Sequence, residues 1–288
     1  MANRKKAVMD AATIRIFVEM AALLAAIIVL LVLIGNVNSG SPRPAKKDPV
    51  ETTESTLPSV AAIPEDTSPE GIFQAFLKKH NLTMDDYTET MIENYALYPE
   101  TREFILNYPL EKDKEHVADI SWADPSEGVP LFLQFDERWG YTPYGKTVGG
   151  VSGCAPTCLS MVAYYLTGNT EYTPAYMMKF STDNGYVNSE GGTQWTLFSQ
   201  GAKKLGFKVE ELPLSESVLV NRVEKGYPVV LSVREGDFTV NGHYVVIVGY
   251  ENGKFKVNDP FSKANSEGEY TYARLEPQIR NLWAISNP

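Results

Sequence analysis

The chain has 288 residues, of which 43% are hydrophobic and 22% are charged, a composition typical of globular proteins. A chain of this length exceeds one minimal domain and can bury a sizeable core. Its formal net charge of -10 argues against a protein that binds nucleic acid along the phosphate backbone, so we expect no nucleic-acid partner.

The N-terminus combines a basic cluster, between residues 4 and 15, with a long apolar run. Residues 20–34 carry no charge, and counting back to Ile16 gives roughly the 18–20 residues that a bilayer requires. A helix that is apolar on every face favours a membrane anchor over a buried core helix. Since a positive flank stays cytoplasmic, we expect a cytoplasmic tail (1–15), a transmembrane signal anchor (16–35) and an extracytoplasmic remainder.

A cleaved signal peptide is the alternative for the same segment, and the protein would then be secreted. Val37 and Ser39 are small enough for a weak cleavage site. The basic region before the apolar run is long, however, and the run exceeds the usual length of a signal-peptide core. We therefore favour the uncleaved anchor, with one helix in the cell membrane.

The next two segments differ in composition from the rest of the chain. Residues 36–67 are rich in Pro, Ser, Thr and charge, which predicts a disordered linker. Residues 68–118 predict a small helical module of three short helices. The first starts at the cap Ser68, the second at the cap Thr83, and the third lies between Pro99 and Pro109.

Residues 119–288 predict a further domain of α+β class. Short β-branched and apolar segments, separated by Gly, Pro and Asn, predict strands near residues 207–212, 228–233, 243–250, 254–259 and 282–286. Helices are expected at residues 155–166, 193–205 and 215–225. The Asn-Gly pair at Gly253 is a strong hairpin signal. Helices followed by antiparallel strands are typical of an α+β fold.

Both cysteines of the chain lie in the segment GVSGCAPTCLSMVAYYL, four residues apart. An extracytoplasmic location makes a disulfide the first hypothesis. Side chains four apart on a helix hold their Cβ atoms about 5–6 Å apart, whereas a disulfide requires about 3.5–4.5 Å. With two thiols, three histidines and no Cys-x-x-Cys spacing, zinc is poorly supported, and we expect neither metal nor cofactor.

A nucleophilic cysteine fits this segment better. Gly149, Gly150 and Gly153 allow close approach to the helix, and Pro156 belongs in a first helical turn. Cys154 then lies at the helix N-terminus, where unpaired N–H groups and the helix dipole stabilise a thiolate. Cys158 lies one turn deeper on the apolar face, where a small core residue is expected.

A thiolate nucleophile needs a partner that can act as an acid, and that acid needs an orienting acceptor. His243 is the only histidine of the strand-rich half and stands at the start of its most apolar strand. The following strand ends at Asp259, so a hairpin would return Asp259 to the start of the first strand. A strand-edge histidine and an Asp-Pro strand terminator are the structural alternatives. Gln134, upstream of the cysteine, offers an amide donor for a developing oxyanion.

The order Gln, Cys, His, Asp carries a family resemblance. The segments VPLFLQFDERWG, GVSGCAPTCLSMVAYYLTG, GHYVVIVGY and VNDP resemble the papain-like cysteine peptidase family typified by the double-glycine leader peptidases. They are most similar to its stand-alone, secreted or membrane-anchored bacterial branch, over roughly residues 128–286.

The resemblance implies a papain-like fold, with a nucleophile helix packed on an antiparallel sheet. By resemblance, Cys154 would be the nucleophile, His243 the general base, Asp259 the orienting residue and Gln134 the oxyanion donor. Ala155 and Cys158 stand where relatives often carry Gly and Ser, and neither change removes a catalytic atom. Leader peptidases act in the cytoplasm and are fused to an exporter. This chain shows no exporter, so the leader-peptide substrate is not carried over.

The expected function is that of a membrane-tethered extracytoplasmic cysteine peptidase. Its expected partners are a peptide or protein substrate, with cell-wall peptide included, and the membrane through one N-terminal helix. One alternative is a non-catalytic peptide- or wall-binding module on the same fold. Another is a transglutaminase-like acyl transferase or a wall amidase, although the Asp-Cys-Ser start usual for such amidases is absent because Gly153 precedes Cys154.

Overall fold

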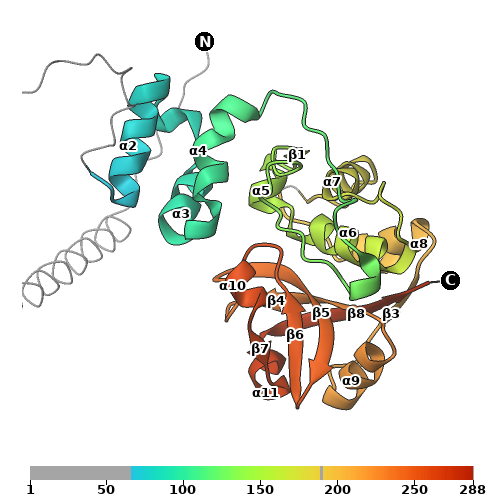
Figure 1. The fold of residues 1–288 in the computed structure, drawn as a ribbon. Helices are drawn as coiled ribbons and strands as arrows, with labels where there is room; N and C mark the ends of the chain where they lie inside the picture. The colour runs from blue at the N-terminus through green and yellow to red at the C-terminus, as the bar shows by residue number, and fades with distance from the viewer. Residues whose placement is uncertain (1–65, 189–190, 288) are drawn as a thin grey trace, which may run out of the picture. The chain divides into compact units, whose positions relative to one another are not determined.

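The computed structural model describes residues 66–188 and 191–287, which belong to one compact unit (Figure 1). The predicted tail and anchor, and all but the end of the predicted linker, lie outside the described residues. Within the described ranges, no helix has the length and apolar character needed to cross a bilayer.

Three helices make up the N-terminal module, as the sequence predicts. They are α2 (Pro69–His80), α3 (Glu89–Leu97) and α4 (Arg102–Glu111), joined by the 3-10 turns η1 (Met84–Asp86) and η2 (Pro99–Thr101). The Ser68 cap is confirmed, since its side chain accepts a hydrogen bond from the Gly71 N–H.

Two boundaries of the module differ from the prediction. Thr83 caps only the short turn η1, and α3 begins later, after the cap Thr88. Pro109 does not end α4 but lies inside its last turn, because a proline there removes only one hydrogen bond near a terminus.

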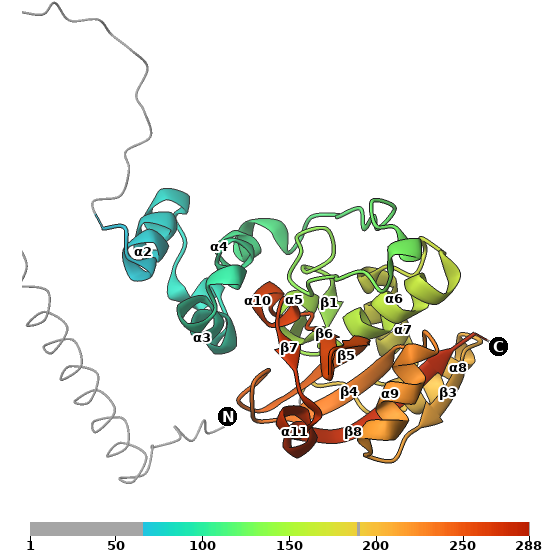
Figure 2. The same cartoon turned by 60° about the horizontal axis from the view of Figure 1, so that its bottom comes forward.

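The helices of the remaining chain fall into two groups around a sheet. On one face lie α6 (Cys154–Thr167), α7 (Pro174–Asp183) and α8 (Ala202–Lys204), and on the other lie α9 (Glu216–Glu224) and α11 (Tyr272–Leu275) (Figures 1 and 2). Shorter elements are η3 (Pro125–Glu127), α5 (Gly149–Ser152), the π turn η4 (Leu197–Gly201), α10 (Lys263–Ser266) and η5 (Glu276–Gln278). The helix expected over 193–205 therefore starts later, at η4.

The sheet has six antiparallel strands in the order β3-β8-β4-β5-β6-β7. Their bounds are β3 (Lys208–Glu211), β4 (Val229–Arg234), β5 (Gly242–Glu251), β6 (Lys254–Asn258), β7 (Glu269–Tyr270) and β8 (Ile279–Ser286). A separate two-stranded sheet joins β1 (Pro143–Tyr144) to β2 (Thr147–Val148). The five predicted strands and the α+β class are confirmed.

The predicted hairpin between β5 and β6 is also confirmed. Both residues of its turn have the left-handed conformation that Asn-Gly favours, with φ of 52° at Asn252 and 79° at Gly253. Halfway along β5 the register shifts by one residue. This irregularity matters for the site, because a one-residue shift exchanges the faces on which side chains lie.

The helical module packs directly on the domain that follows it. Phe104 and Ile105 of α4 share one hydrophobic cluster with Phe135, Tyr141 and Val148 from the chain around β1 and β2. The ring of Phe104 stacks on that of Tyr141, with centroids 4.6 Å apart. The module therefore shares a core with the sheet domain.

Candidate active site

Cys154 is the first residue of α6 and is partly exposed. The chain reaches it through the single turn α5 and the cap Gly153. A side chain at Gly150 would come within 2.3 Å of Phe104, so glycine is required there for close packing on the module. As the first residue of a helix, Cys154 has a backbone N–H without an intrahelical partner, and the helix dipole favours negative charge at its Sγ atom.

Cys158 has a different environment from Cys154, and both thiols are free. Cys158 is fully buried, and burial raises the pKa of its thiol well above the usual value. Its Sγ donates a hydrogen bond to the backbone oxygen of Tyr244, at 3.3 Å. This bond ties α6 to β5 beside His243, which is more than the space-filling role expected from the sequence.

His243 and Asp259 meet across the β5–β6 hairpin. The distance between His243 Nε2 and Asp259 Oδ1 is 2.7 Å, and both side chains are buried. On the side of the register shift away from the turn, Asn258, the last residue of β6, pairs with Val246. The next residue, Asp259, therefore comes opposite Val245 and lies on the same face as His243. Without that shift, Asp259 would come opposite Val246 and lie on the other face.

The second ring nitrogen of His243 is not bound to Asp259, and Cys154 is close enough to affect the pKa of the ring. Burial alone lowers the pKa of His243, but the negative charges of Asp259 and Cys154 and their hydrogen bonds outweigh it. Together they raise the pKa of His243 to about 10. The raised pKa favours the imidazolium form of the ring, in which each nitrogen carries a proton.

Two residues that the sequence reasoning missed hold Asp259 in place. Its Oδ1 also accepts a hydrogen bond from the Phe261 N–H at 2.8 Å, and its Oδ2 accepts one from Asn265 Nδ2 at 2.8 Å. The sequence signal for Asn265 is weak. Ser262 stands three residues earlier as a helix cap, and its Oγ accepts a hydrogen bond from the Asn265 N–H.

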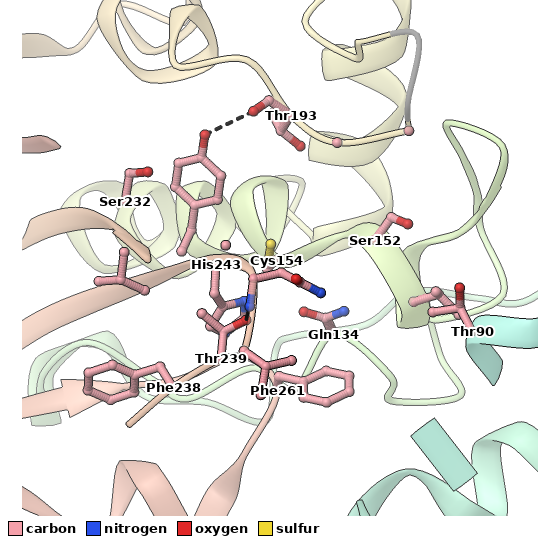
Figure 3. Close-up of a pocket in the computed structure, with 18 of the residues that line it drawn as sticks. Thr90, Gln134, Ser152, Cys154, Thr193, Ser232, Phe238, Thr239, His243 and Phe261 are labelled. Atoms are coloured by element: carbon pink, nitrogen blue, oxygen red, sulfur yellow. Dashed lines mark hydrogen bonds between the residues drawn. The ribbon is translucent and has the colours of Figure 1, made fainter. Parts of the chain in front are cut away.

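Gln134 is buried in the same region, beside the glycine turn that precedes Cys154. Its Nε2 donates to the Gly150 carbonyl at 3.1 Å and lies 3.5 Å from the Gly149 carbonyl. Its Oε1 has no hydrogen-bond partner among the described residues. Figure 3 shows that oxygen on the side of Cys154 and His243. In this orientation both contacts of the amide nitrogen are with glycine carbonyls, so the amide presents its oxygen and not an N–H to the cleft, and the oxyanion role of Gln134 stays a prediction.

Gln134, Cys154, His243 and Phe261 line one cleft of about 640 Å³ (Figure 3), and Asp259 lies behind His243, outside that lining. Leu97 and Glu93 of α3 form part of its wall, opposite residues of the sheet domain such as Trp195 and Ser232. The structure thus brings Cys154, His243 and Asp259 together and places Gln134 in the same cleft. Across residues 66–188 and 191–287, no group of three His, Cys, Asp or Glu side chains is arranged to hold a metal ion.

A nucleophile helix packed on an antiparallel sheet, with a histidine at the start of a strand, defines the papain-like cysteine peptidase fold. Residues 126–287, more than half of the chain, match the model of the Peptidase C39-like family. The chain belongs to this family.

Solved structures of similar fold include the peptidase domain of Streptococcus ComA, a bifunctional ABC transporter involved in a quorum sensing pathway. Its sequence is 23% identical to this chain. The match covers 56% of this chain and 99% of that domain, with a TM-score of 0.41. A putative C39-like peptidase from Bacillus anthracis is 19% identical and covers 60% of this chain and 99% of its own, with a TM-score of 0.39. No curated protein sequence matches the chain.

Proposed function

We propose that this protein is a cysteine peptidase that hydrolyses peptide bonds with Cys154 as nucleophile, His243 as acid and base, and Asp259 as orienting residue. The observation that carries the proposal is the buried His243–Asp259 pair, whose ring shares one cleft with Cys154 at the start of α6. A protonated ring beside a thiol at a helix N-terminus favours a thiolate–imidazolium pair, which is the reactive form of such enzymes.

The mechanism follows from this geometry. The thiolate of Cys154 attacks the carbonyl carbon of the peptide, and the oxyanion is stabilised by the Cys154 N–H and by Gln134, once its amide has turned an N–H towards the cleft. His243 Nδ1, the nitrogen not bound to Asp259, transfers its proton to the leaving amine. The neutral ring then takes a proton from water, which hydrolyses the acyl-enzyme, while Asp259 keeps the ring oriented.

The proposal includes an extracytoplasmic location. It rests on the sequence alone, on the basic cluster followed by the apolar run 16–35. The tether would hold the cleft outside the membrane through the segment 36–67. Peptides exposed at the cell surface, including the peptide part of the cell wall, are then the substrates within reach.

The test is turnover of a synthetic peptide library by the purified full-length protein in detergent, with products identified by mass spectrometry. We expect the wild type, and not Cys154→Ala, to produce fragments with free carboxylates. New amides formed with added amines would instead identify an acyl transferase. Absence of any turnover, in a protein whose Cys154 is alkylated by iodoacetamide, would identify a binding module.

A further inference from the structure

The helical module contacts the segment that follows Asp259 through one carboxylate. Glu100, in the turn η2 between α3 and α4, accepts a hydrogen bond from Ser262 Oγ at 2.9 Å. It also accepts hydrogen bonds from the backbone N–H groups of Lys263, at 2.8 Å, and Ala264, at 3.4 Å. These three donors surround the first turn of α10. Bonds to an ionised carboxylate are stronger than bonds between neutral groups.

The segment held by Glu100 is the one that fixes Asp259. Asn265, in α10, donates to Asp259 Oδ2 at 2.8 Å. Ser266 completes the arrangement, because its Oγ accepts a hydrogen bond from the Asp259 N–H at 2.9 Å. Since α10 has only four residues, its own hydrogen bonds cannot hold it rigidly, and contacts from outside decide its position.

An aromatic contact links the module to the same place. Tyr98, two residues before Glu100, packs edge-on against Phe261, with ring centroids 5.0 Å apart. Phe261 in turn lies edge-on to His243, with centroids 6.3 Å apart, and its N–H donates to Asp259. The turn around Glu100 is itself firm, because the hydroxyl of the buried Thr101 donates to the Tyr98 carbonyl at 2.9 Å.

We infer that Glu100 is a positioning residue of the active site, which acts through Ser262 and α10 to hold Asp259 against His243. The helical module is then part of the catalytic apparatus and not a spacer between the anchor and the peptidase. The inference rests on the proposed function only for its effect on turnover. Its effect on the Cys154–His243 pair can be measured without any peptide substrate.

The experiment compares wild type, Glu100→Ala, Glu100→Gln and the control Glu89→Ala in the full-length protein. Glu89 is an exposed carboxylate of the same module, at the start of α3, and contacts no residue of the site. Two experiments are made well below the melting temperature of each variant. Steady-state kinetics give kcat and KM for a cleaved peptide. Alkylation by iodoacetamide gives the rate of reaction of Cys154 as a function of pH.

We expect Glu100→Ala to lower kcat by roughly 10- to 100-fold with KM nearly unchanged, the scale expected when a catalytic group is misplaced by about 1 Å. The pH range in which Cys154 reacts as part of a thiolate–imidazolium pair should end at a lower pH in Glu100→Ala than in the wild type. Glu100→Gln keeps one acceptor oxygen and should recover most of kcat. Glu89→Ala should match the wild type in both measurements.

Wild-type kcat together with a wild-type alkylation profile in Glu100→Ala would overturn the inference. A raised KM with unchanged kcat would also overturn it, because Glu100 would then bind substrate. If the wild type cleaves no peptide, the proposed function fails, while the alkylation profiles of the four proteins still decide whether Glu100 positions the His243–Asp259 pair.

Discussion

At the scale of single residues, the two thiols lie one helical turn apart and differ in exposure and hydrogen bonding. Cys154 faces the cleft and His243, whereas Cys158 is enclosed and hydrogen-bonded to the Tyr244 backbone. Exposure and a cationic neighbour, rather than the presence of sulfur, make a cysteine reactive.

The first prediction is that the two cysteines respond differently to substitution. Cys154→Ala should abolish turnover and leave the melting temperature close to that of the wild type. Cys158→Ser should keep most activity, because a hydroxyl can also donate to the Tyr244 carbonyl, with a modest stability loss from placing a more polar group in an apolar site. Peptide assays and thermal unfolding measure both effects. An inactive Cys158→Ser beside an active Cys154→Ala would reverse the assignment.

The second prediction concerns Asp259 and pH. The Asp259 carboxylate contributes to the raised pKa of His243, so Asp259→Asn should lower that pKa and move the basic limb of kcat/KM to lower pH. Asn can still accept from His243 Nε2 and the Phe261 N–H, and Asn265 can rotate its amide to present oxygen. Asp259→Ala offers no acceptor and should be far less active. Equal loss in both variants would show that His243 works as a neutral base.

The raised pKa of His243 also determines how the stability of the folded protein changes with pH. The pKa of His243 is raised to about 10 in the folded protein, from about 6.5 for a histidine in an unfolded chain. The folded state therefore holds its proton more tightly. The stabilisation is complete below pH 6.5 and is lost as the pH rises towards 10.

The third prediction concerns Gln134, whose oxyanion role remains to be tested. If an N–H of Gln134 stabilises the oxyanion, Gln134→Ala should lower kcat by about 10²–10³-fold and change KM little. Gln134→Glu is the matched variant, because a carboxylate keeps the size and lacks the donor. Steady-state kinetics of both decide the role, and an unchanged kcat in both would remove Gln134 from the mechanism.

At the scale of elements, α3 supplies one wall of the cleft. Leu97 lines that wall and is 67% exposed, so its side chain is open to a ligand in the cleft. Substrate that reaches α3 would cover this side chain and gain hydrophobic contact. The module would then act in two ways, through Leu97 on binding and through Glu100 on the catalytic residues.

The fourth prediction is that Leu97→Ala raises KM by about 10-fold with kcat unchanged, since partial burial is worth about 1.4 kcal/mol, or a factor of 10, and full burial of a leucine about 1.5–3 kcal/mol. Val117→Ala is the control, because Val117 is 82% exposed and does not line the cleft. Kinetics with a long peptide measure the effect. An unaltered KM for Leu97→Ala would mean that substrate does not reach α3.

At the scale of the whole molecule, the fifth prediction concerns topology. If residues 16–35 anchor the chain with its N-terminus in the cytoplasm, a protease added to intact cells should degrade the region after Asn36 and spare the tail before Arg15. Immunoblots against tags at the two ends measure this. Digestion of the catalytic domain only after lysis would reverse the orientation, and its recovery from the medium would indicate a cleaved signal peptide.

The sequence by itself determined the parts of the protein that depend on local pattern. The short β-branched segments, the Asn252-Gly253 turn and the glycines before Cys154 predicted the hairpin and the nucleophile helix. Once the hairpin is accepted, His243 and Asp259 must come near each other, because antiparallel strands return the chain to its starting edge.

Only the tertiary structure decided how those residues are held. The register shift in β5, which puts Asp259 on the face of His243, comes from pairing across the sheet, and Gly249 inside the strand is only a weak sequence signal for it. The contact between Glu100 and Ser262 joins positions 162 residues apart. A side chain on an exposed turn is indistinguishable in sequence from any solvated carboxylate. Its role exists only because the packing of α4 on the sheet domain brings that turn to α10.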